Sequence, residues 1–219
     1  MSSKKNTKKN KKQPVVKKDY TTIIIFSVII LLVAIVGAIS IFRNDDQTDG
    51  SLTMLDADKT YYADIEIKDY GKITVQLDQS AAPITAANFV MLAQKGFYTD
   101  LTFHRIIEGF MMQGGAPKGV EAEPIVGEFT ENGYNNPLKH ERGVISMART
   151  NDMNSASSQF FIMQQTKTHL DGKYAAFGKV ISGMDVVDAI CTAANPTDNN
   201  GSIAAADQPV ITSITIRIE

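Results

Sequence analysis

The spacing of hydrophobic and polar residues changes three times along this chain of 219 residues. Residues 23–42 are apolar except for two serines and a glycine. From residue 61 onward apolar residues alternate with polar ones in short runs, which is typical of half-buried β-strands. Two segments, 83–95 and 183–193, instead carry apolar residues at helical spacing, and both are predicted to be α-helices.

The alternating part of the chain predicts a mainly antiparallel β fold. A hairpin is expected around Asp69, Tyr70 and Gly71, and Pro83 and Gly96 suit the first turn and the end of the first helix. Because only two helices interrupt the strands, the pattern favours an antiparallel barrel or sandwich over a parallel sheet. The predicted strands are 61–68, 72–78, 101–107, 111–114, 143–148, 158–163, 174–180 and 210–219.

The apolar segment 23–42 is long enough to cross a membrane. Its twenty residues would form a helix of about 30 Å, which matches the hydrocarbon core of a bilayer. A buried helix of a soluble protein would show one polar face, and this segment has none. A cleaved secretory signal is the stronger alternative, but its apolar region is usually about 7 to 15 residues long. We therefore expect a retained transmembrane anchor.

Charge predicts the orientation of that anchor. Residues 1–20 carry eight lysines and one acid, which leaves 14 bases and 23 acids for the rest of the chain, a formal charge of −9. The positive-inside bias places the basic tail, 1–22, in the cytoplasm. Residues 43–59 then form a linker, and a domain at 60–219 lies outside the cell membrane. A nucleic-acid-binding arm is the disfavoured alternative, because a lysine run beside a span more often contacts anionic lipid.

Cys191 is the only cysteine, so no intramolecular disulfide can form. It lies in the predicted helix 183–193, where a buried structural thiol is expected. An extracytoplasmic protein without disulfides fits a bacterium that does not depend on oxidised secreted folds.

Three segments carry a family resemblance. Residues 101–115 read LTFHRIIEGFMMQGG, residues 143–162 read GVISMARTNDMNSASSQFFI, and residues 170–187 read LDGKYAAFGKVISGMDVV. Together they resemble the cyclophilin family of peptidyl-prolyl cis-trans isomerases, over most of residues 60–219. The resemblance implies a closed eight-stranded antiparallel barrel capped by two α-helices, here preceded by one transmembrane helix.

The chemistry of such an isomerase explains the residue types in the first segment. Rotation about an X-Pro bond faces a barrier of about 20 kcal/mol, because amide resonance must be lost. A fixed donor beside the imide nitrogen stabilises the twisted state, and an arginine stays charged and presents a rigid fork of donors. By resemblance Arg105 is that donor. If residues 108–110 form a three-residue loop, Arg105 faces Gln113; a two-residue loop would place them on opposite faces.

The resemblance also assigns the remaining site residues. Arg105, Gln113 and Phe110 are the implied catalytic residues, and the backbone at Ala148 and Arg149 is expected to pair with an extended substrate. Phe160 and Phe161 are adjacent in a strand, so one of them packs inward and the other can line the groove. The implied substrate-binding residues are Phe103, Met111, Ala148, Arg149, Gln159, Phe161, His169, Leu170 and Tyr174.

The chain departs from many family members at two groove positions. His169 stands where many have a tryptophan, and Tyr174 stands where animal members often have a histidine. The drug cyclosporin contacts that tryptophan in sensitive members, so cyclosporin binding is expected to be weak here. The loop at 116–142 also lacks the extra glycine-rich turn of the animal proteins.

Other active sites are disfavoured. His104, His140 and His169 do not have zinc-site spacing, the serines at 155–158 lack a nucleophile elbow, and GGAPKG lacks the lysine-serine pair of a phosphate-binding loop. No cofactor is implied. The sequence thus predicts an isomerase that assists the folding of exported, proline-containing proteins. The alternative is a non-catalytic proline-peptide binding module or holdase that uses the same groove.

Overall fold

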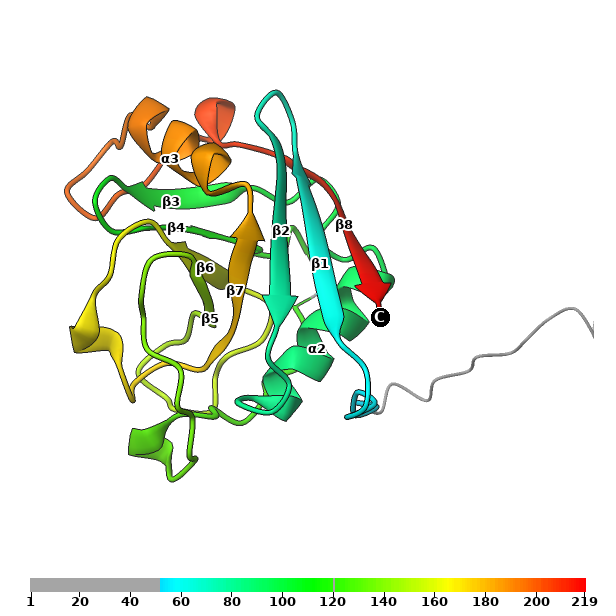
Figure 1. Ribbon diagram of the computed structural model, residues 1–219. Helices are drawn as coiled ribbons and strands as arrows, with labels where there is room; N and C mark the ends of the chain where they lie inside the picture. Colours follow the sequence, from blue (N-terminus) through cyan, green and yellow to red (C-terminus); the bar gives the residue numbers. More distant parts are fainter. Residues whose placement is uncertain (1–51, 120) are drawn as a thin grey trace, which may run out of the picture. The chain divides into compact units, whose positions relative to one another are not determined.

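Eight antiparallel strands form one curled sheet in the order β3-β4-β6-β5-β7-β2-β1-β8 (Figure 1). The computed structural model describes residues 52–119 and 121–219. The predicted basic tail and the predicted span at 23–42 lie outside these residues. Within the described residues, the structure contains no helix with the length and apolar character that crossing a membrane requires.

The strands agree closely with the sequence pattern, with ends that differ by at most two residues. They are β1 (Tyr61–Ile67), β2 (Gly71–Leu77), β3 (Phe103–Ile107), β4 (Met111–Gly114), β5 (Val144–Met147), β6 (Phe160–Met163), β7 (Ala176–Ser182) and β8 (Ile211–Ile218). The two α-helices among the described residues are α2 (Pro83–Gln94) and α3 (Met184–Ala193). Short 3-10 turns lie at Thr130–Asn132, Thr168–Leu170 and Ala205–Asp207.

The predicted closed barrel is a curled sheet in the structure. β3 and β8 are the two edge strands, and they meet through one bridge between Thr102 and Val210. Backbone hydrogen bonds beside it run from Phe103 N–H to the Pro209 carbonyl, 2.9 Å, and from Ile211 N–H to the Leu101 carbonyl, 2.8 Å. The number of strands and their antiparallel pairing are as predicted. The edge strands β3 and β8, however, are joined beside one end of β3 and not by a continuous ladder of hydrogen bonds.

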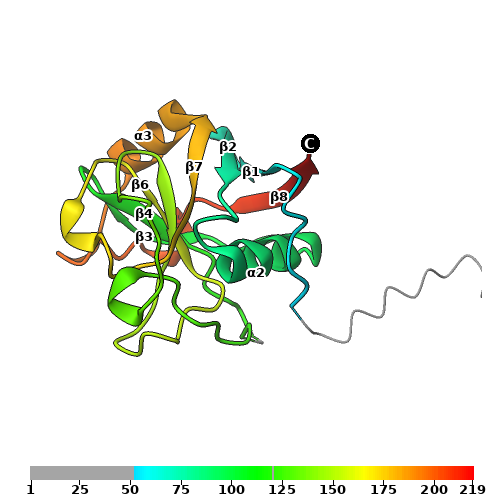
Figure 2. The ribbon, with the colours of Figure 1, turned by 60° about the horizontal axis from the view of Figure 1, so that its bottom comes forward.

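The two helices lie at opposite ends of the curled sheet in both views (Figures 1 and 2). Phe89 of α2 is fully buried, with its ring 5.1 to 5.4 Å from the rings of Tyr98, Phe160 and Phe177. α3 buries Val187, Ile190 and Cys191 against the other end, so Cys191 is buried as expected. Burial raises the pKa of its thiol to about 12, which keeps it protonated and unreactive.

A distant carboxylate completes the N-terminus of α2. The helix begins at Pro83, and Ala82 before it offers no side-chain cap. Glu128 is 2% exposed and accepts hydrogen bonds from the backbone N–H groups of Ile84 and Thr85, at 3.1 and 2.7 Å, and from the Thr85 hydroxyl at 2.7 Å. A negative charge at this end of a helix is favourable because the free N–H groups point toward it. Glu128 therefore fastens the loop before β5 to α2.

The first and last described strands hold the two ends of the domain together. β1 pairs with β8 along its whole length, and the backbones of Thr60 and Glu219 exchange two hydrogen bonds, of 2.8 and 2.9 Å. Asp64 in β1 also accepts a hydrogen bond from Arg217 in β8 at 2.9 Å. The two strands therefore form a continuous antiparallel pair from end to end.

Strand alternation produces a main core and a second apolar cluster. The main core fills the inside of the curled sheet and contains Phe89, Phe103, Met112, Phe160 and Ile162. The second apolar cluster consists of Met111, Val144, Phe161, Met163, Leu170 and Ala176. Neighbouring residues of β4 and β6 thus belong to different clusters, because successive side chains of a strand point to opposite faces. The second cluster is the one that supports the candidate site.

Candidate active site

The hairpin of β3 and β4 has the register that brings Arg105 opposite Gln113. Ile107 pairs with Met111 and Arg105 with Gln113, so residues 108–110 form the three-residue loop. Gly109 in this loop has φ +73°, a conformation that glycine adopts without strain. Of the two loops that the sequence allowed, the structure has the one that places both side chains on one face.

Hydrogen bonds on three sides hold the Arg105 guanidinium. Its Nη1 donates to Gln113 Oε1 at 3.2 Å, and its Nε donates to the Asn200 backbone carbonyl at 2.8 Å. Nη2 lies 3.4 Å from the side-chain oxygen of Asn200, a longer contact. Gln113 is itself oriented, because its amide nitrogen donates to Gln159 Oε1 at 3.0 Å. The cation is therefore fixed in place by the protein.

Asn200 is not among the site residues predicted from the sequence. It lies between α3 and β8, 95 residues from Arg105 along the chain, so the hairpin motif does not include it. Its neighbour Gly201 has φ +86°, and a Cβ there would collide with the Ile107 side chain and the Ile106 carbonyl. The signal available in the sequence was the turn DNNG at 198–201, which indicates a tight loop but not its partner.

A pocket of about 130 Å³ lies beside this guanidinium, and we call it the Arg105 pocket. The second apolar cluster supplies its apolar wall. The lining residues come from β3, β4 and the loop between them, from β6, and from the segments 148–149 and 170–174. Most of the predicted site residues meet there. Its lining residues are Arg105, Phe110, Met111, Gln113, Ala148, Arg149, Phe161, Leu170 and Tyr174.

Phe160 and Phe161 divide between the two faces of β6 as expected. Phe160 is fully buried in the main core, whereas Phe161 is 5% exposed, belongs to the second apolar cluster and lines the Arg105 pocket. The Tyr174 ring meets Phe161 edge-on, with centroids 5.8 Å apart. The guanidinium of Arg149 lies 4.9 Å from the Tyr174 ring centroid and donates to the Lys173 carbonyl at 3.0 Å. Aromatic rings and one stacked cation therefore form this side of the pocket.

Phe103 does not line the pocket. It is fully buried in the main core, with its ring edge-on to Phe160 at 5.9 Å. The pairing of β3 with β4 shifts between Phe103 and Arg105, so these residues face opposite sides although they are two positions apart. The expectation that Phe103 binds substrate is therefore wrong, because this irregularity turns its side chain into the main core.

Two further predicted residues lie around the pocket and not in its wall. Gln159 contacts Gln113 and thereby supports Arg105. His169 is exposed on the 3-10 turn Thr168–Leu170, with its ring centroid 6.0 Å from that of Phe110. The histidine is thus at the rim, next to one of the lining rings.

The chemistry that this arrangement supports follows from its parts. An apolar pocket takes up a flat, uncharged ring, and the fixed guanidinium offers donors to a nitrogen lone pair at its edge. Such preorganised donors need no rearrangement when charge develops during a reaction. The described residues of the pocket include neither a nucleophile paired with a base nor a group of metal ligands.

Residues 62–216 match the family model described as cyclophilin type peptidyl-prolyl cis-trans isomerase. The chain belongs to this family. Among curated cyclophilins, the Dickeya dadantii peptidyl-prolyl cis-trans isomerase A is 43% identical over 55% of this chain and 66% of its own length. The Bacillus subtilis isomerase B is also 43% identical, over 54% of this chain and 82% of its own length.

A solved cyclophilin has the same fold. The Cryptosporidium parvum cyclophilin type isomerase, crystallised in the presence of the dipeptide Ala-Pro, superimposes with a TM-score of 0.62 and 30% identity, covering 71% of this chain and 98% of its own. The chain spans just under two thirds of the Dickeya relative. It spans only 22% to 28% of three isomerase-like 2 proteins from Rhizopus and Aspergillus.

Proposed function

We propose that this chain is a peptidyl-prolyl cis-trans isomerase that binds the proline ring of an extended polypeptide in the Arg105 pocket. In this mechanism Phe161, Met111 and Leu170 form the apolar slot. The Arg105 guanidinium donates to the imide nitrogen as its lone pair leaves conjugation with the carbonyl. No covalent bond forms, and the rate gain comes from preorganised electrostatic stabilisation of the twisted bond.

One observation carries the proposal: the Arg105 guanidinium is held at the edge of an apolar pocket by Gln113 and Asn200. A holdase or a non-catalytic binding module needs the slot but has no use for a fixed donor beside the imide nitrogen. The Cryptosporidium relative, solved with Ala-Pro, supports a proline dipeptide as the smallest substrate element. Catalysis is therefore favoured over binding alone.

The test is the rate of cis-trans exchange in an Ala-Pro-containing peptide, measured by NMR exchange spectroscopy with the full-length protein. Arg105→Ala should lower catalytic efficiency about 100-fold, roughly 3 kcal/mol of transition-state stabilisation, and should leave folding intact. Peptide binding should persist, since the apolar slot is unchanged. Near-normal exchange in the folded variant would contradict the proposal, and binding without any exchange in the parent protein would favour the holdase.

We also propose that the protein is a membrane-anchored form from a bacterium and acts on exported proteins. The support is the sequence alone: an uncharged apolar segment at 23–42, preceded by eight lysines and followed by an acidic linker. The positive-inside bias then gives a single-pass protein with a cytoplasmic N-terminus and an extracytoplasmic isomerase domain.

Protease treatment of intact protoplasts tests this orientation. A chain tagged at its N-terminus should lose the isomerase domain to the protease and keep the tag, because only the part after residue 42 is exposed. Complete protection of the chain would mean that the isomerase domain lies on the cytoplasmic side. A chain released into the medium without its N-terminal segment has a cleaved signal.

A further inference from the structure

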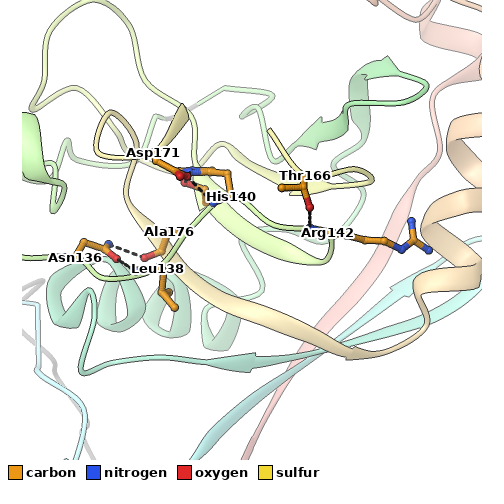
Figure 3. A network of polar contacts seen from close by, with 8 residues as sticks. Asn136, Leu138, His140, Arg142, Thr166, Asp171 and Ala176 are labelled. Atoms are coloured by element: carbon orange, nitrogen blue, oxygen red, sulfur yellow. Dashed lines mark hydrogen bonds and ion pairs between the residues drawn. The ribbon is translucent and has the colours of Figure 1, made fainter. Parts of the chain in front are cut away.

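A buried histidine lies directly behind the Arg105 pocket. The His140 side chain is fully buried and contacts the Asp171 carboxylate through Nδ1 at 3.2 Å and the Ser146 hydroxyl through Nε2 at 3.1 Å. Figure 3 shows Asp171 meeting the His140 ring. Ser146 is itself fully buried. We call these three residues the His140 cluster, and its members come from a loop, from β5 and from the turn before β7.

The loop that carries His140 is fixed by polar contacts of its own. Asn136 donates to the Glu128 carbonyl at 2.9 Å. It also donates to the Ala176 carbonyl at 2.8 Å, and its side-chain oxygen accepts from Leu138 N–H at 3.1 Å (Figure 3). On the other side the Arg142 backbone N–H donates to the Thr166 hydroxyl at 3.1 Å. Hydrogen bonds on both sides of His140 therefore hold the loop that carries its ring.

The hydrogen bonds define one tautomer of the ring. The Asp171 carboxylate accepts from the His140 backbone N–H at 2.8 Å and also faces Nδ1, so Nδ1 carries the ring proton. Nε2 is then left as an acceptor for the Ser146 hydroxyl. Burial lowers the pKa of His140, and this effect outweighs the opposing hydrogen bond and charge of Asp171. The ring is accordingly neutral near pH 7 and each of its nitrogens has a partner.

The same ring touches two residues that line the pocket. It stacks on Phe161 with an interplanar angle of 17° and a centroid distance of 5.9 Å. It also meets Tyr174 edge-on, at 79° and 6.4 Å. Ser146 stands opposite Phe161 in the pairing of β5 with β6. The polar contacts of His140 thus fix the plane against which the Phe161 ring rests.

We propose that His140 is a positioning residue for the isomerase, because Asp171 and Ser146 hold its ring in the plane that sets Phe161 and Tyr174 in the pocket. His140 touches no substrate in this arrangement. Its effect passes through the two rings that contact the proline. The effect of His140 on turnover rests on the proposed function. The position of its ring rests on the contacts of the His140 cluster.

A double variant separates positioning from simple stability. His140→Phe keeps a flat ring of similar size against Phe161 but loses both polar contacts and would leave the Ser146 hydroxyl buried without a partner. Adding Ser146→Ala removes that unpaired hydroxyl, and replacing both partners by apolar groups is often nearly neutral for stability. The matched control is Asp64→Asn, which weakens the ion pair between Asp64 in β1 and Arg217 in β8 (2.9 Å), a pair that includes no residue of the His140 loop or of the Arg105 pocket.

Three measurements on the full-length proteins decide the matter: melting temperature, affinity for an Ala-Pro-containing peptide by NMR titration, and cis-trans exchange rate. The double variant should melt close to the parent, bind the peptide about fivefold more weakly and lose about tenfold in catalytic efficiency, since a small displacement of a positioning group is costly. The Phe161 ring signals should shift. Asp64→Asn should leave affinity and exchange rate as in the parent.

Two outcomes would overturn the inference. One is a folded double variant with unchanged affinity, exchange rate and Phe161 signals. The other is an equal loss of affinity in Asp64→Asn, which would mean that any loosening of the fold has the same effect. Affinity and ring signals do not depend on turnover, so they still test the role of His140 if the parent protein proves to bind proline peptides without isomerising them.

Discussion

At the scale of single residues, the site depends on how tightly one guanidinium is held. Arg105 has a side-chain partner in Gln113 and a backbone partner in Asn200, and the two restrain different nitrogens. A flexible arginine would lose conformational entropy each time it aligned with the substrate, whereas a fixed one has lost it during folding. Substitution of Gln113 or Asn200 should therefore lower catalytic efficiency according to how strongly the lost side chain holds Arg105.

Gln113 and Asn200 give contrasting predictions. Gln113→Ala removes the 3.2 Å contact to Nη1, and we expect catalytic efficiency to fall about tenfold with the fold intact. Asn200→Ala keeps the carbonyl that accepts from Nε and loses only the 3.4 Å contact, so its efficiency should stay within about twofold of the parent. Exchange spectroscopy on both variants checks this order, and the reverse order would show that Gln113 does not orient the arginine.

His169 at the rim predicts weak inhibition by cyclosporin. Its exposed ring lies 6.0 Å from the Phe110 ring, and an imidazole offers less apolar surface than an indole. His169→Trp should tighten inhibition, with little change in turnover because Arg105 and Phe161 are untouched. Inhibition constants and catalytic efficiencies of the two proteins would be compared. Tight inhibition of the natural sequence, or no gain from tryptophan, would contradict this role for position 169.

At the scale of elements, the two-residue period of the strands predicted a mainly antiparallel β fold, whereas the family resemblance implied the site residues. Alternation also placed Phe160 and Phe161 on opposite faces of their strand. The sequence left open whether the hairpin loop has two or three residues, and the structure has the three-residue loop 108–110 that sets Arg105 opposite Gln113. The irregular pairing at Phe103 could not be predicted, because a one-residue shift leaves no mark in the hydrophobic pattern when both neighbours are apolar or amphipathic.

The long-range contacts of loop residues could not be predicted from the sequence either. Asn200 reaches Arg105 across 95 residues, and His140 reaches Asp171 across 31. Each lies in an irregular segment with no period of its own, so its partner depends on the completed fold. His140 was considered only as a metal ligand, and its role behind Phe161 became visible once both rings had positions.

The junction between α2 and the loop at Glu128 gives an element-scale prediction. Glu128→Gln removes the negative charge at the helix N-terminus and turns an amide donor toward backbone N–H donors. We expect the free energy of unfolding to fall by about 2 kcal/mol. Urea denaturation would measure it, with exposed Glu131→Gln as the control that should stay within about 0.5 kcal/mol of the parent. Equal stability of the two variants would show that Glu128 is not the cap of α2.

At the scale of the whole molecule, the buried His140 and the half-buried His104 make the fold sensitive to mild acid. Burial lowers the pKa of both His104 and His140, which are therefore neutral in the folded state while the unfolded chain is protonated below about pH 6.5. Their contribution to stability is fully present above that pH and is lost as the pH falls below it. Asp64 and Asp188, whose pKa values are lowered, add a second loss only below about pH 4.

Urea denaturation between about pH 7.5 and pH 5 should accordingly show a falling free energy of unfolding. The variant with His140→Phe and Ser146→Ala should show a shallower fall, because one of the two rings with a lowered pKa is gone. A stability that rises on acidification over this interval would mean that the histidines gain protons on folding, contrary to their burial.

Because its first and last strands pair, the domain should tolerate circular permutation, in which the old ends are joined and new ones are opened elsewhere. Since Thr60 and Glu219 exchange two backbone hydrogen bonds, a linker of a few residues can join them, and new ends can be opened in the exposed turn between Asp69 and Tyr70. The resulting circular permutant would begin with β2, and β8 and β1 would become a hairpin. We expect it to keep the same sheet order and an intact Arg105 pocket, since no residue of that pocket lies in β1, β2 or β8. Its exchange activity, compared with that of the parent, would show that the site depends on which strands are adjacent and not on where the polypeptide starts.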